Sequence, residues 1–115
     1  MKSSSKPPAS KVVRLRDFGT RLLFRDRGIE IRGEIERLLE THTPILVDLD
    51  GLEATSPSFV DECLGILLDH IGKDRFKSSI QLNCENEAMR RLVNRVLNNR
   101  LAIQAQNVER ERAPQ

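Results

Sequence analysis

One stretch, residues 44–71, constrains the fold more than any other part of the chain. Ile45, Leu46 and Val47 form a short apolar run that ends in the acids Asp48 and Asp50. This pattern is typical of a strand that is buried on both faces and whose carboxyl end reaches solvent. A turn is expected at Asp50-Gly51, followed by a polar loop. The stretch therefore predicts the strand-to-helix unit from which α/β domains are built.

A helix is predicted over residues 57–71, directly after this loop. Two caps are compatible with its start: Ser56 with Pro57 at the first helical position, or Ser58 with Asp61 three residues later. At helical spacing the apolar residues cover a wide face and the polar ones a narrow stripe, which predicts a mostly buried helix with one thin acidic edge. The wide face comprises Phe59, Val60, Cys63, Leu64, Ile66, Leu67, Leu68 and Ile71, and the stripe comprises Glu62, Gly65 and Asp69.

Alternation and helical periodicity predict the elements on either side. Strands are expected over residues 11–16, near a sheet edge, and over residues 79–83. Residues 20–24 are compatible with a short strand or a first helical turn, and we favour a turn or strand. Helices are expected over 27–40, with Gly33 allowing close approach to the sheet, and over 86–100, while 72–77 reads as a polar connection. The expected buried positions are Ile31, Ile35, Leu38 and Leu39 in the first helix and Met89, Leu92, Val93, Val96 and Leu97 in the last.

Strands that alternate with helices predict parallel pairing through crossover connections. We therefore expect an α/β fold: a small sandwich in which a central, mostly parallel or mixed sheet is packed by three helices. The domain is expected to span residues 11–103, with a disordered tail over 1–10 and a frayed polar tail over 104–115. Binding sites of such sheets lie beyond the carboxyl ends of the strands, which is where the 50–58 loop falls.

Composition excludes several classes of function. The 115 residues suffice for one domain, and with no Trp, no Tyr and four Phe the chain lacks the rings of a base-stacking platform. No apolar run is long enough to span a bilayer and the first residues do not resemble a signal segment, so we expect a cytoplasmic protein. Cys63 and Cys84 are expected in or near the core rather than in a disulfide, and no spacing suggests zinc, another metal or a cofactor.

Charge is distributed unevenly along the chain. Lys2 and Lys6 account for the net charge of +2, every charged residue from Pro44 to Asp69 is acidic, and residues 89–100 contain arginines and no acid. Such separation suggests either two surfaces with different partners or two segments whose opposite charges pair with each other within the chain. One alternative function is therefore nucleic-acid association through the arginine face of the 86–100 helix, although exposed arginines are more often solvated or paired. That face comprises Arg90, Arg91, Arg95 and Arg100.

The central stretch resembles a known family. The resemblance rests on two segments, Asp48-Leu-Asp-Gly-Leu-Glu53 and Ser56-Pro-Ser-Phe-Val-Asp-Glu-Cys-Leu-Gly65. These residues look like the core of the STAS-like domain-of-unknown-function family, relatives of the STAS domains of bacterial anti-sigma factor antagonists. The likeness covers roughly residues 11–100 and is most specific at residues 58–62. Further matches are Phe18-Gly19, Arg25, Gly28, Ile31-Arg32 and Asn83.

The resemblance implies a non-catalytic interaction module of bacterial signalling. Its partner would be an ATPase or kinase with the histidine-kinase-like ATP fold, and a Ser at the start of the central helix would be phosphorylated. This chain departs from the family motif Asp-Ser-Ser-Gly: Ser56 takes the place of the Asp, Pro57 that of the usual phospho-acceptor, and Ser58 that of the second Ser.

The same acids and hydroxyls also have a structural interpretation. Both Ser are suited to capping a helix, and acids in a first helical turn favour the helix dipole. The residues predicted to bind a partner are Asp50, Glu53, Ser56, Ser58, Asp61 and Glu62, with Ser58 and Ser56 as possible phosphorylation sites.

Overall fold

A parallel sheet of three strands forms one layer of the molecule. The computed structural model describes the backbone of residues 8–112 and the side chains of residues 8–110. Strands β1 (Lys11–Arg14), β3 (Ile45–Asp48) and β5 (Ile80–Asn83) lie in the order β1-β3-β5, with Val13 paired to Val47 and Val47 to Leu82. The predicted parallel pairing and the edge position of the first strand are confirmed. Of the tail predicted over residues 1–10, residues 1–7 lie outside the described residues, whereas the Ser10 backbone N–H donates to the Pro44 carbonyl at 2.8 Å.

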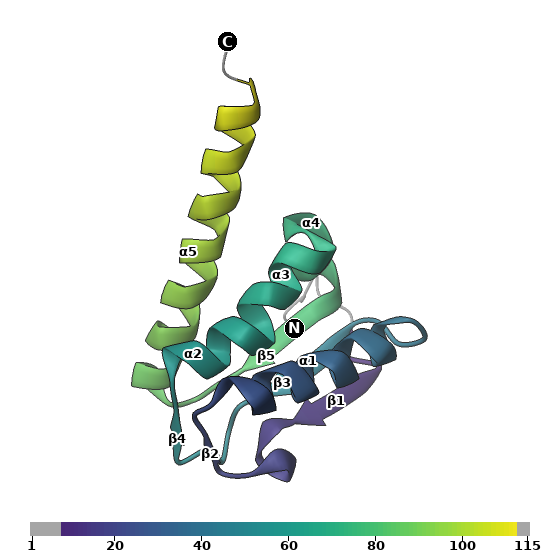
Figure 1. The fold of residues 1–115 in the computed structure, drawn as a ribbon. Helices are drawn as coiled ribbons and strands as arrows, with labels where there is room; N and C mark the ends of the chain where they lie inside the picture. The colour runs from purple at the N-terminus through teal and green to yellow at the C-terminus, as the bar shows by residue number, and fades with distance from the viewer. Residues whose placement is uncertain (1–7, 113–115) are drawn as a thin grey trace, which may run out of the picture.

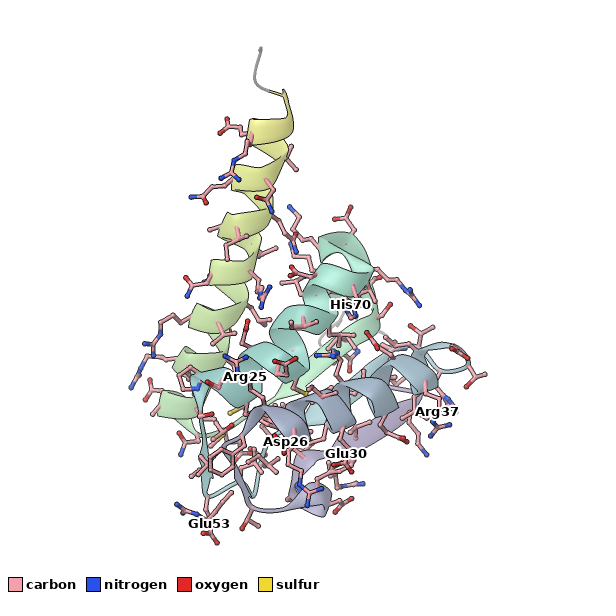
Figure 2. All side chains as sticks on the ribbon, in the orientation of Figure 1. Arg25, Asp26, Glu30, Arg37, Glu53 and His70 are labelled. Atoms are coloured by element: carbon pink, nitrogen blue, oxygen red, sulfur yellow. The ribbon has the colours of Figure 1, made fainter. Side chains whose placement is uncertain are left out.

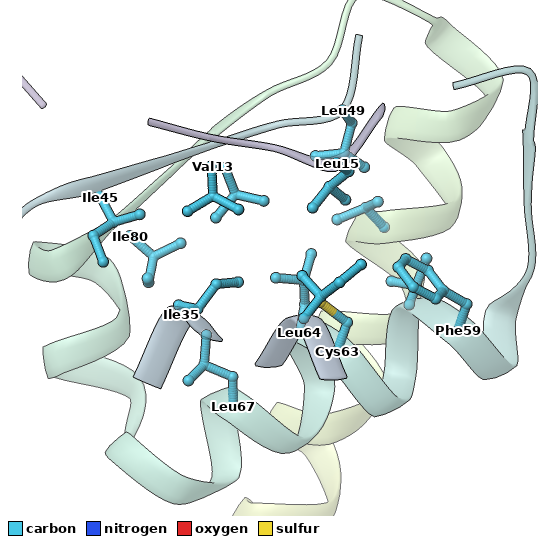
Figure 3. Close-up of a cluster of buried hydrophobic side chains, with 14 of the residues drawn as sticks. Val13, Leu15, Ile35, Ile45, Leu49, Phe59, Cys63, Leu64, Leu67 and Ile80 are labelled. Atoms are coloured by element: carbon cyan, nitrogen blue, oxygen red, sulfur yellow. The ribbon is translucent and has the colours of Figure 1, made fainter. Parts of the chain in front are cut away.

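Two helical segments cover one face of this sheet (Figure 1). Helix α1 (Arg25–Leu39) contributes Ile31 and Ile35, and the central helix contributes Leu64 and Leu67, to a core shared with the strands (Figure 3). Leu46 points to the opposite face by strand alternation and is only half-buried, so the prediction that β3 is buried on both faces is wrong. The fold is confirmed as α/β, with its helices on one side of the sheet.

The central helix contains a wide turn in its middle. It runs as α2 (Pro57–Val60), a π-helical stretch η2 (Asp61–Gly65) and α3 (Ile66–Ile71), and the Ile66 N–H donates to the Asp61 carbonyl five residues back. Ser56 caps its start, with Pro57 at the first helical position and the Ser56 hydroxyl accepting from the Phe59 N–H at 3.1 Å. The first of the two predicted caps is thus confirmed. π-Helical turns often lie at functional sites.

The loop before this helix is held by a second, very short sheet. Strand β2 (Arg21–Leu22) pairs in parallel with β4 (Ala54–Thr55), which confirms the strand interpretation of residues 20–24. The Thr55 hydroxyl also donates to the Leu22 carbonyl at 2.9 Å. The 50–58 loop is therefore hydrogen-bonded to the segment that precedes α1.

The last elements are more helical than expected. Residues predicted as a polar connection form α4 (Lys73–Ser79), with Phe76 buried, because Gly72 turns the chain at φ +90° and allows a new helix to start. Helix α5 (Glu87–Arg112) packs on the central helix and then extends beyond the rest of the molecule (Figure 1). Residues 104–112, expected to fray, continue it, because no Gly or Pro interrupts them and Gln104 donates to Asp69 at 2.7 Å.

Close approach between helices depends on Gly28 rather than Gly33. A Cβ at Gly28 would lie 2.8 Å from the Glu62 Cβ and 3.0 Å from the Phe59 carbonyl oxygen, whereas one at Gly33 meets nothing within 4 Å. The expectation for Gly33 is wrong because this residue lies on the exposed side of α1. Within the described part of the chain, no helix has the length and apolar character needed to cross a membrane.

Candidate docking surface

Two acids of the central helix, Asp61 and Asp69, are paired with an arginine of α5. Arg100 donates from Nε and Nη2 to the two carboxylate oxygens of Asp61, both at 2.7 Å, and from Nη1 to Asp69 at 2.6 Å. These hydrogen bonds lower the pKa of Asp61 and raise that of Arg100. Gly65 leaves room for the contact, because a Cβ there would overlap the Asp61 carboxylate and lie 3.2 Å from Arg100. We call this arrangement the Arg100 clasp.

Glu62 is paired from the other side, by α1. Arg25 donates to Glu62 Oε1 at 3.0 Å, and Arg32 contacts both Oε2, at 3.3 Å, and the Glu62 carbonyl oxygen. The Glu62 and Arg32 side chains are only 14% exposed, whereas that of Arg25 is 61% exposed. Neither Asp61 nor Glu62 is therefore a free acid in the first turns of the helix, where a partner's cation was expected to bind.

The acids at the carboxyl ends of the strands form a third internal network. Asn83 donates to Asp48 at 3.0 Å and to Asp50 at 2.9 Å, and the other Asp50 oxygen accepts from the Glu85 N–H at 2.8 Å. Arg16 adds an ion pair with Asp48 at 3.1 Å and a hydrogen bond to the Asp50 carbonyl. Although burial opposes ionisation of Asp48, the bonds from Asn83, the Asp50 N–H and Arg16 lower its pKa overall. This network pairs the acids at the carboxyl ends of the strands, where a site was expected, with groups of the same chain.

The remaining predicted site residues differ in accessibility. The Ser56 hydroxyl donates to the Leu23 carbonyl at 2.6 Å while it caps the helix. Ser58, two residues further along the chain, is half-buried, and its hydroxyl makes no hydrogen bond within the described residues. Glu53 projects from the loop before β4 into solvent (Figure 2). Of the six predicted residues, Ser58 and Glu53 thus present side-chain groups that internal contacts do not occupy.

A groove runs between the start of α2 and α5. It encloses about 400 Å³, with Ser58, Arg25 and the Arg100 clasp on its walls. Phe24, the residue before Arg25, is 72% exposed. Sequence reasoning did not identify this groove, because its lining residues come from helices that are far apart in the chain. Its lining comprises Arg25, Pro57, Ser58, Asp61, Val96, Asn99, Arg100 and Ile103.

The predicted arginine face of α5 is divided between two sides of the helix. Arg90, Arg91 and Arg95 are exposed, with Arg91 3.6 Å from Glu87. Arg100 instead faces the central helix in the clasp. The prediction that all four arginines lie on one exposed face is therefore wrong, because the acids of the central helix neutralise Arg100. Nothing in the geometry of the described residues favours nucleic-acid association.

The cysteines occupy different environments. Cys63 is fully buried, and burial raises the pKa of its thiol to about 12, while Cys84 is half-buried; both are free. A buried thiol with so high a pKa is unreactive at neutral pH. Among the described residues, no group of His, Cys, Asp and Glu side chains has an arrangement suited to holding a metal ion.

The fold and surface define a small α/β domain with one helical layer, a π turn in its central helix and charged groups that are paired internally. The chain belongs to a family described as the STAS-like domain of unknown function (DUF4325), whose model matches residues 27–89, more than half of the chain. The match begins in α1 and ends in the first turn of α5, so it contains the central helix and the π turn. Comparison with curated proteins and with solved structures found no match. Membership suggests a regulatory or interaction module.

Proposed function

We propose that the chain is a non-catalytic protein-interaction module of bacterial signalling, acting in the cytoplasm. It docks a partner protein at the start of the central helix, through Ser58, the adjoining groove and the solvent-exposed end of the 50–58 loop at Glu53. The resemblance suggests that this partner is an ATPase or kinase with the histidine-kinase-like ATP fold. Membership in the STAS-like family supports the regulatory class.

The observation that carries this proposal is a contrast near the start of the central helix: the acidic side chains are paired within the chain, whereas other side chains are exposed. Asp48, Asp50, Asp61 and Glu62 are each held by groups of the same chain. Beside them Ser58 and the partly exposed Ile103 line an open groove. Exposed apolar side chains in a groove are a common feature of surfaces that bind another protein, whereas internally paired acids are poorly placed for acid–base catalysis.

Site-specific photo-cross-linking in the source cells tests the proposal. A photoreactive amino acid at position 58 should yield one discrete protein adduct, which mass spectrometry identifies. The same amino acid at position 37, at the far end of α1 (Figure 2), serves as the control. Docking elsewhere, or no docking, is indicated if position 58 gives no adduct or gives the same adducts as position 37.

If the partner is a kinase, we expect phosphate on Ser58 and not on Ser56. The Ser56 hydroxyl is bonded to Leu23 and Phe59, so a phosphate there would break the helix cap. A phosphate on Ser58 adds about −1.5 to −2 charges near a helix N-terminus, where negative charge is favourable. Phosphopeptide mass spectrometry of the chain recovered from its host distinguishes the two positions, and a phosphate on Ser56 alone would contradict the assignment.

A further inference from the structure

We propose that the groove between α2 and α5 receives an acidic segment of the partner protein, with Arg25 as the residue that binds its carboxylates. This inference rests on the proposed docking function and names the chemistry of what docks. The charge of the ligand follows from which charges are already paired within the chain and which still face the groove.

Arg25 retains unused hydrogen-bonding capacity. Among the described residues its side chain makes one hydrogen bond, from Nη1 to Glu62, which also pairs with the half-buried Arg32. A guanidinium has five N–H donors. With its side chain 61% exposed at the groove wall, Arg25 has donors and charge to offer a ligand. Arginine is well suited to this task because its planar fork binds carboxylates in a bidentate manner.

Asp61, the acid that lines the groove, is less able to bind a cation of a partner than Arg25 is to bind an anion. Both carboxylate oxygens of Asp61 accept hydrogen bonds from Arg100, and the nearby charge of Arg25 further favours the ionised, paired state of Asp61. The charged side chains that line the groove itself are Arg25, Arg100 and Asp61, whereas Asp69 and Glu62, which also pair with Arg100 and Arg25, lie outside the lining. Complementarity of charge therefore favours an anionic ligand.

The same groove offers apolar surface beside the charge. Pro57, Val96 and Ile103 contribute to its lining, and Ile103 is 47% exposed. Arginine and large apolar side chains in a recess are the usual anchors of protein interfaces. The expected ligand is thus a segment in which Asp or Glu lies next to a large apolar residue.

Peptide-display selection against the purified full chain tests this chemistry. We expect the enriched peptides to pair Asp or Glu with an apolar residue. A synthetic peptide of the enriched sequence should then lose about tenfold or more in affinity for Arg25→Gln, the range expected when one member of a close charge pair is removed.

Arg37→Gln is the matched control. Arg37 also lies on α1, is similarly exposed and pairs with Glu34 on its own helix, but it is at the opposite end from the groove (Figure 2). Its affinity for the peptide should stay unchanged. Because Arg25→Gln preserves the Arg32 to Glu62 pair, we expect it to fold. Ile103→Glu provides a second variant, which should also weaken binding by adding a negative charge to the wall.

Each outcome decides the inference. Enrichment of basic or uncharged peptides, no enrichment at all, or acidic peptides whose affinity is insensitive to both Arg25→Gln and Ile103→Glu would overturn it. The docking function itself would survive these results if position 58 still cross-links a partner in cells. If that cross-link is absent as well, both the partner chemistry and the docking function fail.

Discussion

At the scale of single residues, Gly65 determines whether the Arg100 clasp can form. We expect Gly65→Ala to lower the free energy of unfolding by about 1–3 kcal/mol, the usual cost of forcing extra volume into a packed site. The added methyl group would displace the Asp61 carboxylate from Arg100. Urea denaturation of the variant and the wild type measures the difference.

Gly33→Ala is the control for this substitution, because Gly33 is also helical but a methyl group added there would meet no atom within 4 Å. It should stabilise the protein by about 0.5–1 kcal/mol, since alanine restricts the unfolded chain more than glycine does. If the two variants changed stability alike, Gly65 would have no special role in the clasp.

The clasp should also make stability depend on pH. Arg100 lowers the pKa of Asp61 in the folded protein, so its contribution is present above the ordinary carboxyl pKa and is lost as pH falls through the lowered value. We expect Asp61→Asn to be less stable than wild type at neutral pH, and the difference to shrink below about pH 4. Denaturation at a series of pH values measures this, and a difference that is independent of pH would contradict the pairing.

At the scale of elements, the periodicity of apolar residues located the main helices and strands, because burial of one face of an element requires that periodicity. Ile31, Ile35, Val93 and Val96 are buried as their spacing predicts. The two-residue strand β4 carries too short a pattern to be recognised, and at β2 the pattern left a strand, a turn and a first helical turn open. The π turn was also invisible, because residues 61–65 keep the apolar spacing of an ordinary helix.

The site was only partly predictable for a similar reason. The sequence located the acids of the central helix, but their partners Arg25, Arg32 and Arg100 lie 30–39 residues away in the chain. Pairing over such distances depends on how α1 and α5 cross the central helix. Charge segregation left open whether the two charged segments face different partners or each other, and for Arg100 the second alternative holds.

The outer turns of α5 should be less stable than its base. Val93 and Val96 are buried against the domain, whereas residues 105–110 are exposed and Gln104 makes the last recorded link to the central helix. Helical stability in proteins comes mainly from tertiary packing. We expect backbone amides of residues 105–112 to exchange with solvent on the order of 100-fold faster than those of residues 93–100. Equal protection, measured by NMR, would mean that another body covers these turns.

At the scale of the whole molecule, we consider three surfaces of the described residues as places where a partner could bind. They are the groove at the start of α2, the open sheet face around Val12 and Leu46, and the outer face of α5 with Arg90, Arg91 and Arg95. We assign docking to the groove, where exposed apolar side chains and a partly free arginine coincide. The other two surfaces are the alternatives against which this assignment must be judged.

The most direct measurement is the backbone amide NMR spectrum of the isotope-labelled chain with and without the partner that position 58 captures. We predict that the largest shifts fall on Phe24, Arg25, Ser58 and Ile103, with the open sheet face and the outer face of α5 unchanged. Shifts centred on Leu46 or on Arg90 and Arg95, with the groove unaffected, would contradict docking at the groove.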